Sequence, residues 1–375
     1  MTTLMLTHEY PPYPGGVGRY CAELLSAAEE SGIDLHVLAP EFSSYGESRH
    51  HARITRFPGG VFHPRGLLAA VSAINRVIRT KKFDRIHVAD WPMLIALYWS
   101  RAPKDIPVSM TFHGTDALIL GRSKVLRLLG AKRAARRVDT AFANSAFTLG
   151  LVRSAFPEGL GKRQAVTPLG VGAHWFEPPE PSWCQSARTL AGAKDGDEII
   201  LTVARLDRRK GHIKALRAIG QIEKSERDRL CYLAIGGEVD KGYKAELEAL
   251  ARELEVRAVF AGRQPDEIVR GAYGAASAFL LPAEPDPSRI EGFGLVFLEA
   301  GAQGLPSIGC RVHAIPEVIA EGSTGWLCDP DDVSDIAAKI KLAIVLGRDS
   351  AARLACIEHV RQYTWARCAA QTYTS

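Results

Sequence analysis

Short apolar runs alternate with longer amphipathic stretches along the chain. The apolar runs are rich in Val, Ile, Leu and Phe, as strands are, whereas the longer stretches repeat their apolar positions at helical spacing. In the first half, the predicted strands are 3–7, 34–38, 54–57, 84–88, 108–112, 140–143 and 165–167, and the predicted helices include 17–30, 67–79, 93–101 and 146–155. This alternation predicts a parallel sheet covered by helices.

The second half repeats the pattern. Its predicted strands are 199–204, 231–235, 258–261, 278–281 and 306–309, and its predicted helices include 214–222, 243–254, 332–346, 351–363 and a last one from about 365. Two series of alternating strands and helices predict two Rossmann-like domains, whose ligands bind beyond the carboxyl ends of the strands.

The boundary between the two series is rich in proline. The segment Glu177-Pro-Pro-Glu-Pro181 is stiff and extended. We therefore predict an N-terminal domain over 1–168, a linker over 169–190, a C-terminal domain over 191–358 and a terminal helix within 359–375.

The segment Glu291–Glu299 carries two carboxylates on either side of a Gly-x-Gly turn. An apolar run follows the turn, so we expect a helix to begin near Phe293 or Gly294. Its N-terminus offers free backbone N–H groups to a phosphate, and Gly292 and Gly294 allow close approach. Both carboxylates then lie within reach of neutral hydroxyls. The alternative is a surface loop with two solvated glutamates.

Basic residues follow the predicted strand 199–204. Arg205 and Lys210 are suited to a leaving diphosphate, because fixed cations stabilise the negative charge that develops as its bond breaks. An ordinary basic surface loop is the alternative, since Arg208 and Arg209 lie between them.

Two segments of the first half follow predicted strands and carry further candidates. Gly15-Gly16-Val17-Gly18 could present N–H groups to a phosphate or form a plain tight turn, and it does not have the spacing of a dinucleotide site. His113 is a candidate acid, base or hydrogen-bond partner, or a structural histidine. Asp116 either caps a turn or contacts an acceptor.

The composition and motifs of the chain argue against several classes of protein. The 375 residues carry a net charge of +5, with no apolar run of membrane-spanning length, no signal-peptide pattern and no zinc-finger or RNA-binding motif. Seven scattered cysteines indicate a reducing cytoplasm rather than a disulfide framework. Residues 1–165 hold 22 basic against 13 acidic side chains, so the first half is basic. This excess indicates either an anionic partner or simply a soluble face.

Together the motifs resemble retaining glycosyltransferases of family 4, which use nucleotide-sugar donors. The resemblance extends over nearly all of the chain. Beside the paired glutamates, it is carried by His8-Glu9-Tyr10-Pro11-Pro12 with Gly15-Gly16, Phe112-His113-Gly114-Thr115-Asp116, Asn144-Ser145-Ala146-Phe147-Thr148, Pro168-Leu169-Gly170-Val171, Arg205-Leu206-Asp207 through Lys210-Gly211, and Phe260-Ala261-Gly262-Arg263.

The resemblance implies an α/β chain with the GT-B fold: two Rossmann-like domains face each other across a cleft, and the C-terminal helix crosses back to the N-terminal domain. It implies transfer of a sugar from a UDP- or GDP-sugar to an acceptor hydroxyl with retention, by front-face attack. His113 would contact the donor sugar, Glu291 its hydroxyls, Glu299 the ribose, and Arg205 with Lys210 the diphosphate. Further donor contacts would come from Gly15, Gly16, Arg263, Gly292, Phe293, Gly294 and Leu295, and acceptor contacts from Asp116 and Arg19.

Two departures from the family pattern leave the donor open. Gly172 stands where many relatives carry Asp, and Gly236-Gly237-Glu238 replaces a common Gly-Asp-Gly-Pro turn. Rival interpretations are a nucleotide-sugar 2-epimerase of the same fold and a nucleotide-sugar-binding protein without transfer activity. The paired glutamates with Arg205 and Lys210 suit transfer better than epimerisation.

We expect no cofactor and no metal, because Asp329-Pro-Asp331-Asp332 precedes a helix and is typical of a cap or turn. We expect a sugar, lipid-linked or small-molecule acceptor and no nucleic acid. Residues 122–137 hold seven basic side chains and no acidic one. As one helix, this segment would place Arg122, Arg133, Arg136 and Arg137 on one arc. It is either a solvated helix or a dock for an anionic membrane, at the inner face of the cell membrane.

Overall fold

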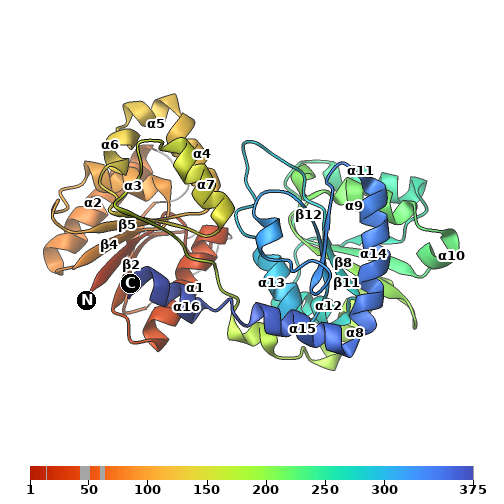
Figure 1. The fold of residues 1–375 in the computed structure, drawn as a ribbon. Helices are drawn as coiled ribbons and strands as arrows, with labels where there is room; N and C mark the ends of the chain where they lie inside the picture. The colour runs from red at the N-terminus through yellow and green to blue at the C-terminus, as the bar shows by residue number, and fades with distance from the viewer. Residues whose placement is uncertain (14, 43–50, 60–63, 375) are drawn as a thin grey trace. The chain divides into compact units, whose positions relative to one another are not determined.

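The computed structural model describes residues 1–13, 15–42, 51–59 and 64–374. The chain forms two compact units: Met1–Gly170 together with Thr364–Ser375, and Val171–Tyr363. Each unit contains one parallel sheet with helices packed against it (Figure 1).

The first unit has a seven-stranded sheet in the order β3-β2-β1-β4-β5-β6-β7, with every neighbouring pair parallel. Its strands are β1 (Thr3–Leu6), β2 (Leu35–Glu41), β3 (Ile54–Pro58), β4 (Arg85–Val88), β5 (Val108–Phe112), β6 (Thr140–Ala143) and β7 (Arg163–Val166). The register pairs Met5 with Val37 on one side and with His87 on the other. The order reverses between β1 and β4, which is where Rossmann-like sheets bind ligands.

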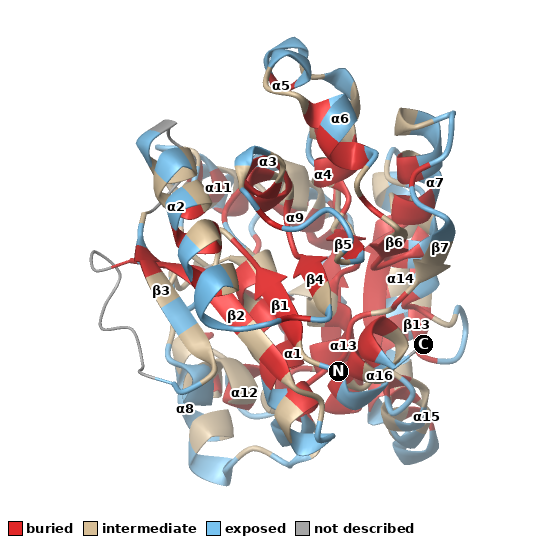
Figure 2. Cartoon of the chain, turned by 90° about the vertical axis from the view of Figure 1, so that its left-hand side faces the viewer, coloured by how far each residue is buried: buried red, intermediate tan, exposed pale blue. Residues whose placement is uncertain are grey.

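The helices of the first unit are α1 (Gly16–Glu30), α2 (Pro64–Thr80), α3 (Trp91–Trp99), α4 (Thr115–Arg122), α5 (Lys124–Leu128), α6 (Ala131–Ala135), α7 (Ala146–Ala155) and the terminal α16 (Trp365–Tyr373). Helix α16, at the blue end of the chain, packs against the red α1 in Figure 1. The central strands are buried, as the red strands β1, β4 and β5 show in Figure 2.

The second unit has a six-stranded sheet in the order β10-β9-β8-β11-β12-β13, again parallel throughout. Its strands are β8 (Glu198–Val203), β9 (Leu230–Ile235), β10 (Ala258–Phe260), β11 (Ala278–Leu281), β12 (Ser307–Cys310) and β13 (Gly325–Cys328). The order reverses between β8 and β11, so this unit has the same topology as strands β1 to β6 of the first.

The helices of the second unit are α8 (Pro181–Leu190), α9 (His212–Gly220), α10 (Lys224–Arg227), α11 (Tyr243–Glu253), α12 (Asp266–Ala275), α13 (Leu295–Ala302), α14 (Val333–Arg348) and α15 (Ser350–Val360); short 3₁₀ turns lie at Ala173–Phe176, Arg208–Lys210 and Ile315–Glu317. Within the described residues, no helix is both long enough and apolar enough to span a bilayer.

One expectation is incomplete and another is wrong. The predicted linker 169–190 contains a helix that was not expected, because Pro181 opens helix α8, which packs against α12. Proline is well tolerated in the first helical turn, where its missing N–H leaves no bond unmade. The basic segment 122–137 is not one helix, because Ser123 is extended and Gly130 has a φ of 91°. These two breaks divide it into the end of α4, α5 and α6, so the expected arc of arginines does not form.

Candidate functional site

The carboxyl ends of the central strands of the second unit bring together three loops. Strand β8 leads into Arg205–Lys210, β11 leads into the loop that carries Glu291, and β12 leads into His313. Gly211 allows the loop after β8 and the loop after β11 to approach closely, because a Cβ atom at Gly211 would lie 1.8 Å from the carbonyl oxygen of Pro282. Its φ of 73° also favours glycine.

Lys210 and Glu291, two of the predicted site residues, form an ion pair. The Lys210 Nζ atom lies 2.5 Å from Glu291 Oε2, and Arg209 Nη1 lies 3.3 Å from the same oxygen. Burial alone would raise the pKa of Glu291, but the charges of Lys210 and Arg209 outweigh it and hold that pKa below its usual value. Glu291 is therefore an ionised carboxylate held by two cations.

Arg209 also connects this pair to Asp207, which is fully buried. Arg209 Nε lies 3.2 Å from Asp207 Oδ2, and Arg289 Nη1 lies 3.2 Å from the same oxygen. The turn after β8 and the loop after β11 are thus joined by alternating charges, which fixes Glu291 relative to Lys210.

The backbone of Glu291 is held from the other side by the loop after β12. Its N–H donates to His313 Nδ1 at 3.2 Å, and its carbonyl accepts the N–H of Ala314 at 3.3 Å. His313 has a φ of 51°, a left-handed conformation that is uncommon for a residue other than glycine. Because Nδ1 accepts, the neutral ring carries its proton on Nε2. Burial lowers the pKa of His313 and favours this neutral form.

Arg205 has a different environment from Lys210. Its side chain is exposed and makes no hydrogen bond or ion pair with any described residue. Its carbonyl oxygen lies 3.1 Å from His212 Nε2, and His212 Nδ1 lies 3.0 Å from the Tyr232 hydroxyl. The backbone of Arg205 is therefore fixed from the core while its guanidinium stays accessible.

Arg263 is likewise exposed, and its side chain lies over the turn after β9. A Cβ atom added at Gly237 would lie 3.1 Å from Arg263 Nε. The neighbouring Gly236 has no room for a side chain, since its Cβ position lies 2.0 Å from the Ala204 carbonyl oxygen. Gly236 thus allows the ends of β8 and β9 to lie in close contact.

The paired-glutamate segment opens helix α13 as expected, with Gly294 as its N-cap at a φ of 86°. Phe293 is buried, and Leu295 is the first helical residue. Glu299 is only 3 % exposed, and its Oε2 accepts the Tyr273 hydroxyl at 3.0 Å. Glu299 is therefore buried in the unit and oriented by Tyr273, and its expected contact with a ribose stays a prediction.

At the corresponding edge of the first unit, the ends of β1 and β4 are joined by His8 and Asp90. His8 Nδ1 lies 3.0 Å from Asp90 Oδ2, which also accepts the His8 N–H at 2.6 Å and the Thr7 hydroxyl at 3.0 Å. Burial lowers the pKa of His8, but the charge of Asp90 and its hydrogen bond outweigh it and raise the pKa to about 9. His8 is thus a cation at neutral pH.

His113 follows β5 at the same edge. One ring nitrogen bonds to the carbonyl of Ala89, whereas the buried Nε2 has no partner among the described residues. Burial lowers the pKa of His113, so the ring is neutral and Nε2 carries a lone pair that can accept a hydroxyl. Asp116 accepts the His113 N–H at 2.9 Å, which is the capping role that we considered for it.

The N-terminus of α1 already has an anionic neighbour. The carboxylate of Glu9 accepts the N–H of Gly18, and a Cβ atom at Gly15 would lie 2.0 Å from Glu9 Oε2. No atom lies within 4 Å of the Cβ position of Gly16. Arg19 lies one turn further along α1. A diphosphate contact at Gly15 and Gly16 stays a prediction, and the carboxylate of Glu9 would be its neighbour at this N-terminus.

Several residues of both edges were not predicted as site residues: His8, Asp90, Asp207, Arg209, His212, Tyr273, Arg289 and His313. Most of them hold a predicted residue in place. Their sequence signal is weak, because most of them pair with a residue distant in the chain, although Asp90 and Asp207 lie in the loops that follow β4 and β8.

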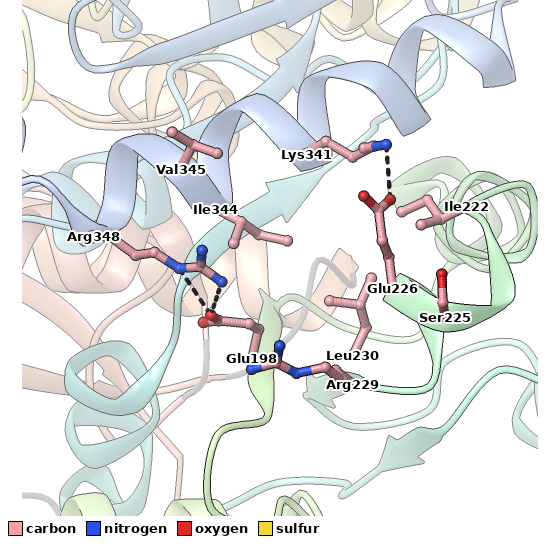
Figure 3. Close-up of a pocket in the computed structure, with 10 residues that line it drawn as sticks. All are labelled: Glu198, Ile222, Ser225, Glu226, Arg229, Leu230, Lys341, Ile344, Val345 and Arg348. Atoms are coloured by element: carbon pink, nitrogen blue, oxygen red, sulfur yellow. Dashed lines mark hydrogen bonds and ion pairs between the residues drawn. The ribbon is translucent and has the colours of Figure 1, made fainter.

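The amino edge of the second sheet contains a hollow of about 290 Å³ that is not connected with these residues. Lys341 Nζ lies 2.7 Å from Glu226 Oε2, and Arg348 Nε lies 3.0 Å from Glu198 Oε1, so these four charges pair with each other (Figure 3). Glu198 begins β8, whereas Arg205 follows the end of that strand. This hollow therefore lies at the opposite end of the sheet.

No group of three or more His, Cys, Asp or Glu side chains in the described ranges could hold a metal ion. The Asp-x-Asp sequence has a local role instead. Asp329 Oδ1 accepts the N–H of Asp331 at 2.9 Å, and Asp332 caps α14 through the N–H groups of Ser334 and Asp335. The expected cap is confirmed.

Comparison with known families matches almost the whole chain. Residues 14–172 match the family described as Glycosyltransferase Family 4, and residues 187–362 match the family described as Glycosyl transferases group 1. The chain belongs to glycosyltransferase family 4 and has the GT-B fold. It is an enzyme that uses nucleotide-sugar donors.

Among its relatives is a GDP-mannose-dependent monoacylated alpha-(1-6)-phosphatidylinositol monomannoside mannosyltransferase of Corynebacterium glutamicum, 26% identical over 89% of this chain and 86% of that protein. A GDP-mannose-dependent alpha-(1-6)-phosphatidylinositol monomannoside mannosyltransferase of Mycolicibacterium smegmatis is 26% identical over 90% of this chain and 87% of that protein. Among solved structures, Anabaena HepE in complex with UDP and glucose superposes with a TM-score of 0.77 at 20% identity, covering 99% of this chain and 98% of that one.

Proposed function

We propose that this enzyme transfers a hexose from a UDP- or GDP-sugar to an acceptor hydroxyl with retention of configuration and without a metal ion. The observation that carries the proposal is the arrangement of Lys210, Glu291 and Arg205 at the carboxyl edge of the second sheet. A nucleoside diphosphate is an anionic leaving group, and an exposed Arg205 beside Lys210 offers two fixed cations to it.

In this proposal Glu291 binds hydroxyls of the transferred sugar. Its carboxylate already forms an ion pair with Lys210. A donor whose phosphate contacts Lys210 would therefore place its sugar next to Glu291. Glu299, oriented by Tyr273, binds the ribose, while Gly292, Gly294 and Leu295 present the N-terminus of α13 to the phosphates. Arg263 contacts the base.

His113 is assigned a hydrogen bond rather than a proton transfer. Its neutral ring and partnerless Nε2 suit it to accept a sugar hydroxyl. A front-face reaction fits this assignment, because the departing phosphate itself takes the acceptor proton. The cations Arg205 and Lys210 then do what a metal ion would do for the leaving group.

The donor is a hexose nucleotide, and the names of the relatives make GDP-mannose and UDP-glucose the first to test. For the acceptor we propose a sugar or lipid-linked hydroxyl in glycolipid or polysaccharide synthesis, supported by the phosphatidylinositol mannosides that the mannosyltransferases act on. We further propose a cytoplasmic enzyme at the inner face of an anionic membrane, supported by the basic first half of the chain.

Two measurements test the proposal. A donor at 100 times its dissociation constant stabilises the protein by about 2.7 kcal/mol. A thermal-shift screen of UDP- and GDP-sugars therefore identifies the donor. Nucleotide release is then followed with and without acceptor, in the presence and absence of EDTA. Transfer predicts that nucleotide release depends on the acceptor. Metal independence predicts that EDTA leaves this release unchanged. An epimerised sugar without acceptor would indicate the 2-epimerase, and donor binding without turnover would indicate a binding protein.

A further inference from the structure

The surface formed by the end of α3 with α5 and α6 combines exposed apolar side chains with unpaired basic ones. We call it the α5 tip and define it by Trp99, Val125 and Leu128 with the basic side chains of residues 122–136. The breaks at Ser123 and Gly130 create it, because they turn α5 out of line with its neighbours.

The apolar part of the α5 tip is unusually exposed. Leu128 is 88 %, Val125 66 % and Trp99 56 % accessible. Val125 and Leu128 are three residues apart on α5, so they share one face, while Leu126 packs into the core and fixes that face outward. Trp99 is held beside them, because its Nε1 donates to the Leu129 carbonyl at 3.0 Å.

Six of the seven basic side chains of residues 122–137 belong to the α5 tip. They are exposed, and none forms an ion pair with an acidic side chain in the described part of the chain; they are Arg122, Lys124, Arg127, Lys132, Arg133 and Arg136. The seventh, Arg137, does not belong to the tip. Its guanidinium donates to the carbonyls of Ala102 and Pro103, and burial lowers its pKa.

This combination fits one kind of partner. Basic side chains alone could bind any polyanion. The exposed Leu, Val and Trp beside them also need an apolar environment directly below a layer of negative charge. An anionic bilayer offers both, and Trp is favoured at the boundary between headgroups and acyl chains. A nucleic acid would leave Val125 and Leu128 in water.

We propose that the α5 tip docks the enzyme on an anionic bilayer, with Val125, Leu128 and Trp99 entering the interface and the six basic side chains contacting lipid phosphates. This deepens the membrane location given under the proposed function and does not depend on which sugar is transferred.

Sedimentation of the full chain with vesicles tests the proposal. Vesicles of phosphatidylcholine with phosphatidylglycerol should bind at least about tenfold more protein than phosphatidylcholine alone, and high salt should remove most of the difference. Equal binding to both vesicle types, or binding to neither, would overturn the proposal.

Variants separate the apolar and basic parts. Val125→Ser with Leu128→Ser should reduce binding to anionic vesicles about tenfold, whereas the matched control, Leu342→Ser with Val345→Ser on the exposed face of α14, should leave it unchanged. Lys124→Ala with Arg127→Ala should reduce binding to anionic vesicles only. If the Val125/Leu128 variant bound like the wild type, the apolar insertion would be refuted.

Two further readouts keep the test independent of transfer. Trp99 fluorescence, taken as the difference between the wild type and Trp99→Phe, should shift to the blue on anionic vesicles only. Nucleotide release with a soluble acceptor should be unchanged in the Val125/Leu128 variant. Loss of vesicle binding with intact nucleotide release in the Val125/Leu128 variant supports docking by the α5 tip. Absence of nucleotide release in the wild type and in all variants, with vesicle binding of the wild type intact, counts against the proposed reaction alone.

Discussion

The carboxyl edges of the two sheets share one topology but differ in their electrostatics. In the second unit, Lys210 and Glu291 form a charged pair beside an exposed Arg205. In the first unit, the corresponding edge has a neutral His113, while the ion pair of His8 with Asp90 is held between strand ends. The second edge is thus equipped for an anionic ligand and the first for hydroxyl groups.

This difference indicates a division of labour that topology alone does not provide. Rossmann-like strand order places loops at the carboxyl edge in both units, but only the residues of those loops decide what binds. If the account is right, charge removal should be costly at the second edge and mild at the first.

The largest effect is expected for the cations of the second edge. Arg205→Ala and Lys210→Ala should each lower kcat about 10²–10³-fold, equivalent to about 3–4 kcal/mol, because leaving-group charge grows toward the transition state. Arg205 is the cleaner test, since its side chain pairs with no described residue. Lys341→Ala, at the amino edge, is the control and should leave kcat unchanged. A rise in KM with unchanged kcat would contradict the leaving-group role.

Glu299→Gln should weaken nucleotide binding by about 1.5–3 kcal/mol, since the charge that binds ribose hydroxyls is lost while the bond from Tyr273 can persist. Calorimetry with the free nucleoside diphosphate measures it. Glu198→Gln removes a carboxylate from the amino edge of the same sheet and serves as the control. Unchanged nucleotide affinity in Glu299→Gln would remove the ribose assignment.

At the first edge, His113→Ala should lower kcat/KM only about tenfold, the scale of one lost hydrogen bond. Because burial keeps the pKa of His113 below its usual value, the wild-type rate should show no titration of this residue near neutral pH. A loss as large as that of Arg205→Ala, or a His113-dependent inflection near pH 7, would mean that His113 transfers a proton.

His313 allows a finer test of the second edge. His313→Ala removes the acceptor for the Glu291 N–H and should lower kcat about 2–10-fold by loosening Glu291. His313→Asn should restore most of the rate, because its side-chain oxygen can accept the same N–H and asparagine tolerates a positive φ. Equal rates in the two variants would show that His313 does not position Glu291.

The smallest effect concerns stability at the first edge. The folded-state pKa of His8 is raised to about 9, so its pair with Asp90 stabilises fully below the unfolded value of about 6.5 and is lost as pH rises toward 9. Wild-type Tm should therefore fall by about 2–4 °C more than that of His8→Gln between pH 6.5 and 9. Parallel Tm profiles would show that the pair contributes no stability.

The sequence predicted the sheets well because their strands are buried and apolar. Strands β5, β6 and β11 and helix α7 have the predicted bounds, whereas β13 and helices α8 and α12 were not predicted. Strand β13 begins at a glycine, a residue that is depleted in strands, so its sequence does not indicate a strand. Helix α8 was not predicted because it begins at Pro181, within a proline-rich segment that indicates an extended chain.

The site could be predicted only in part, for a related reason. Arg205, Lys210 and Glu291 stand in motifs beside strands, and the structure does bring Lys210 and Glu291 together. The residues that hold them, such as Arg209 and His313, act through contacts across 22 to 82 positions of sequence. Spacing within one motif cannot reveal such pairs.

The anomeric configuration of the product tests the central claim most directly. With an α-linked diphospho-hexose donor and an accepted acceptor, the one-bond and vicinal couplings of the anomeric proton in NMR should report an α-linked product, formed in step with nucleotide release and unaffected by EDTA. A β-linked product would contradict the front-face reaction at the Lys210–Glu291 edge, and a free epimerised sugar would contradict transfer itself.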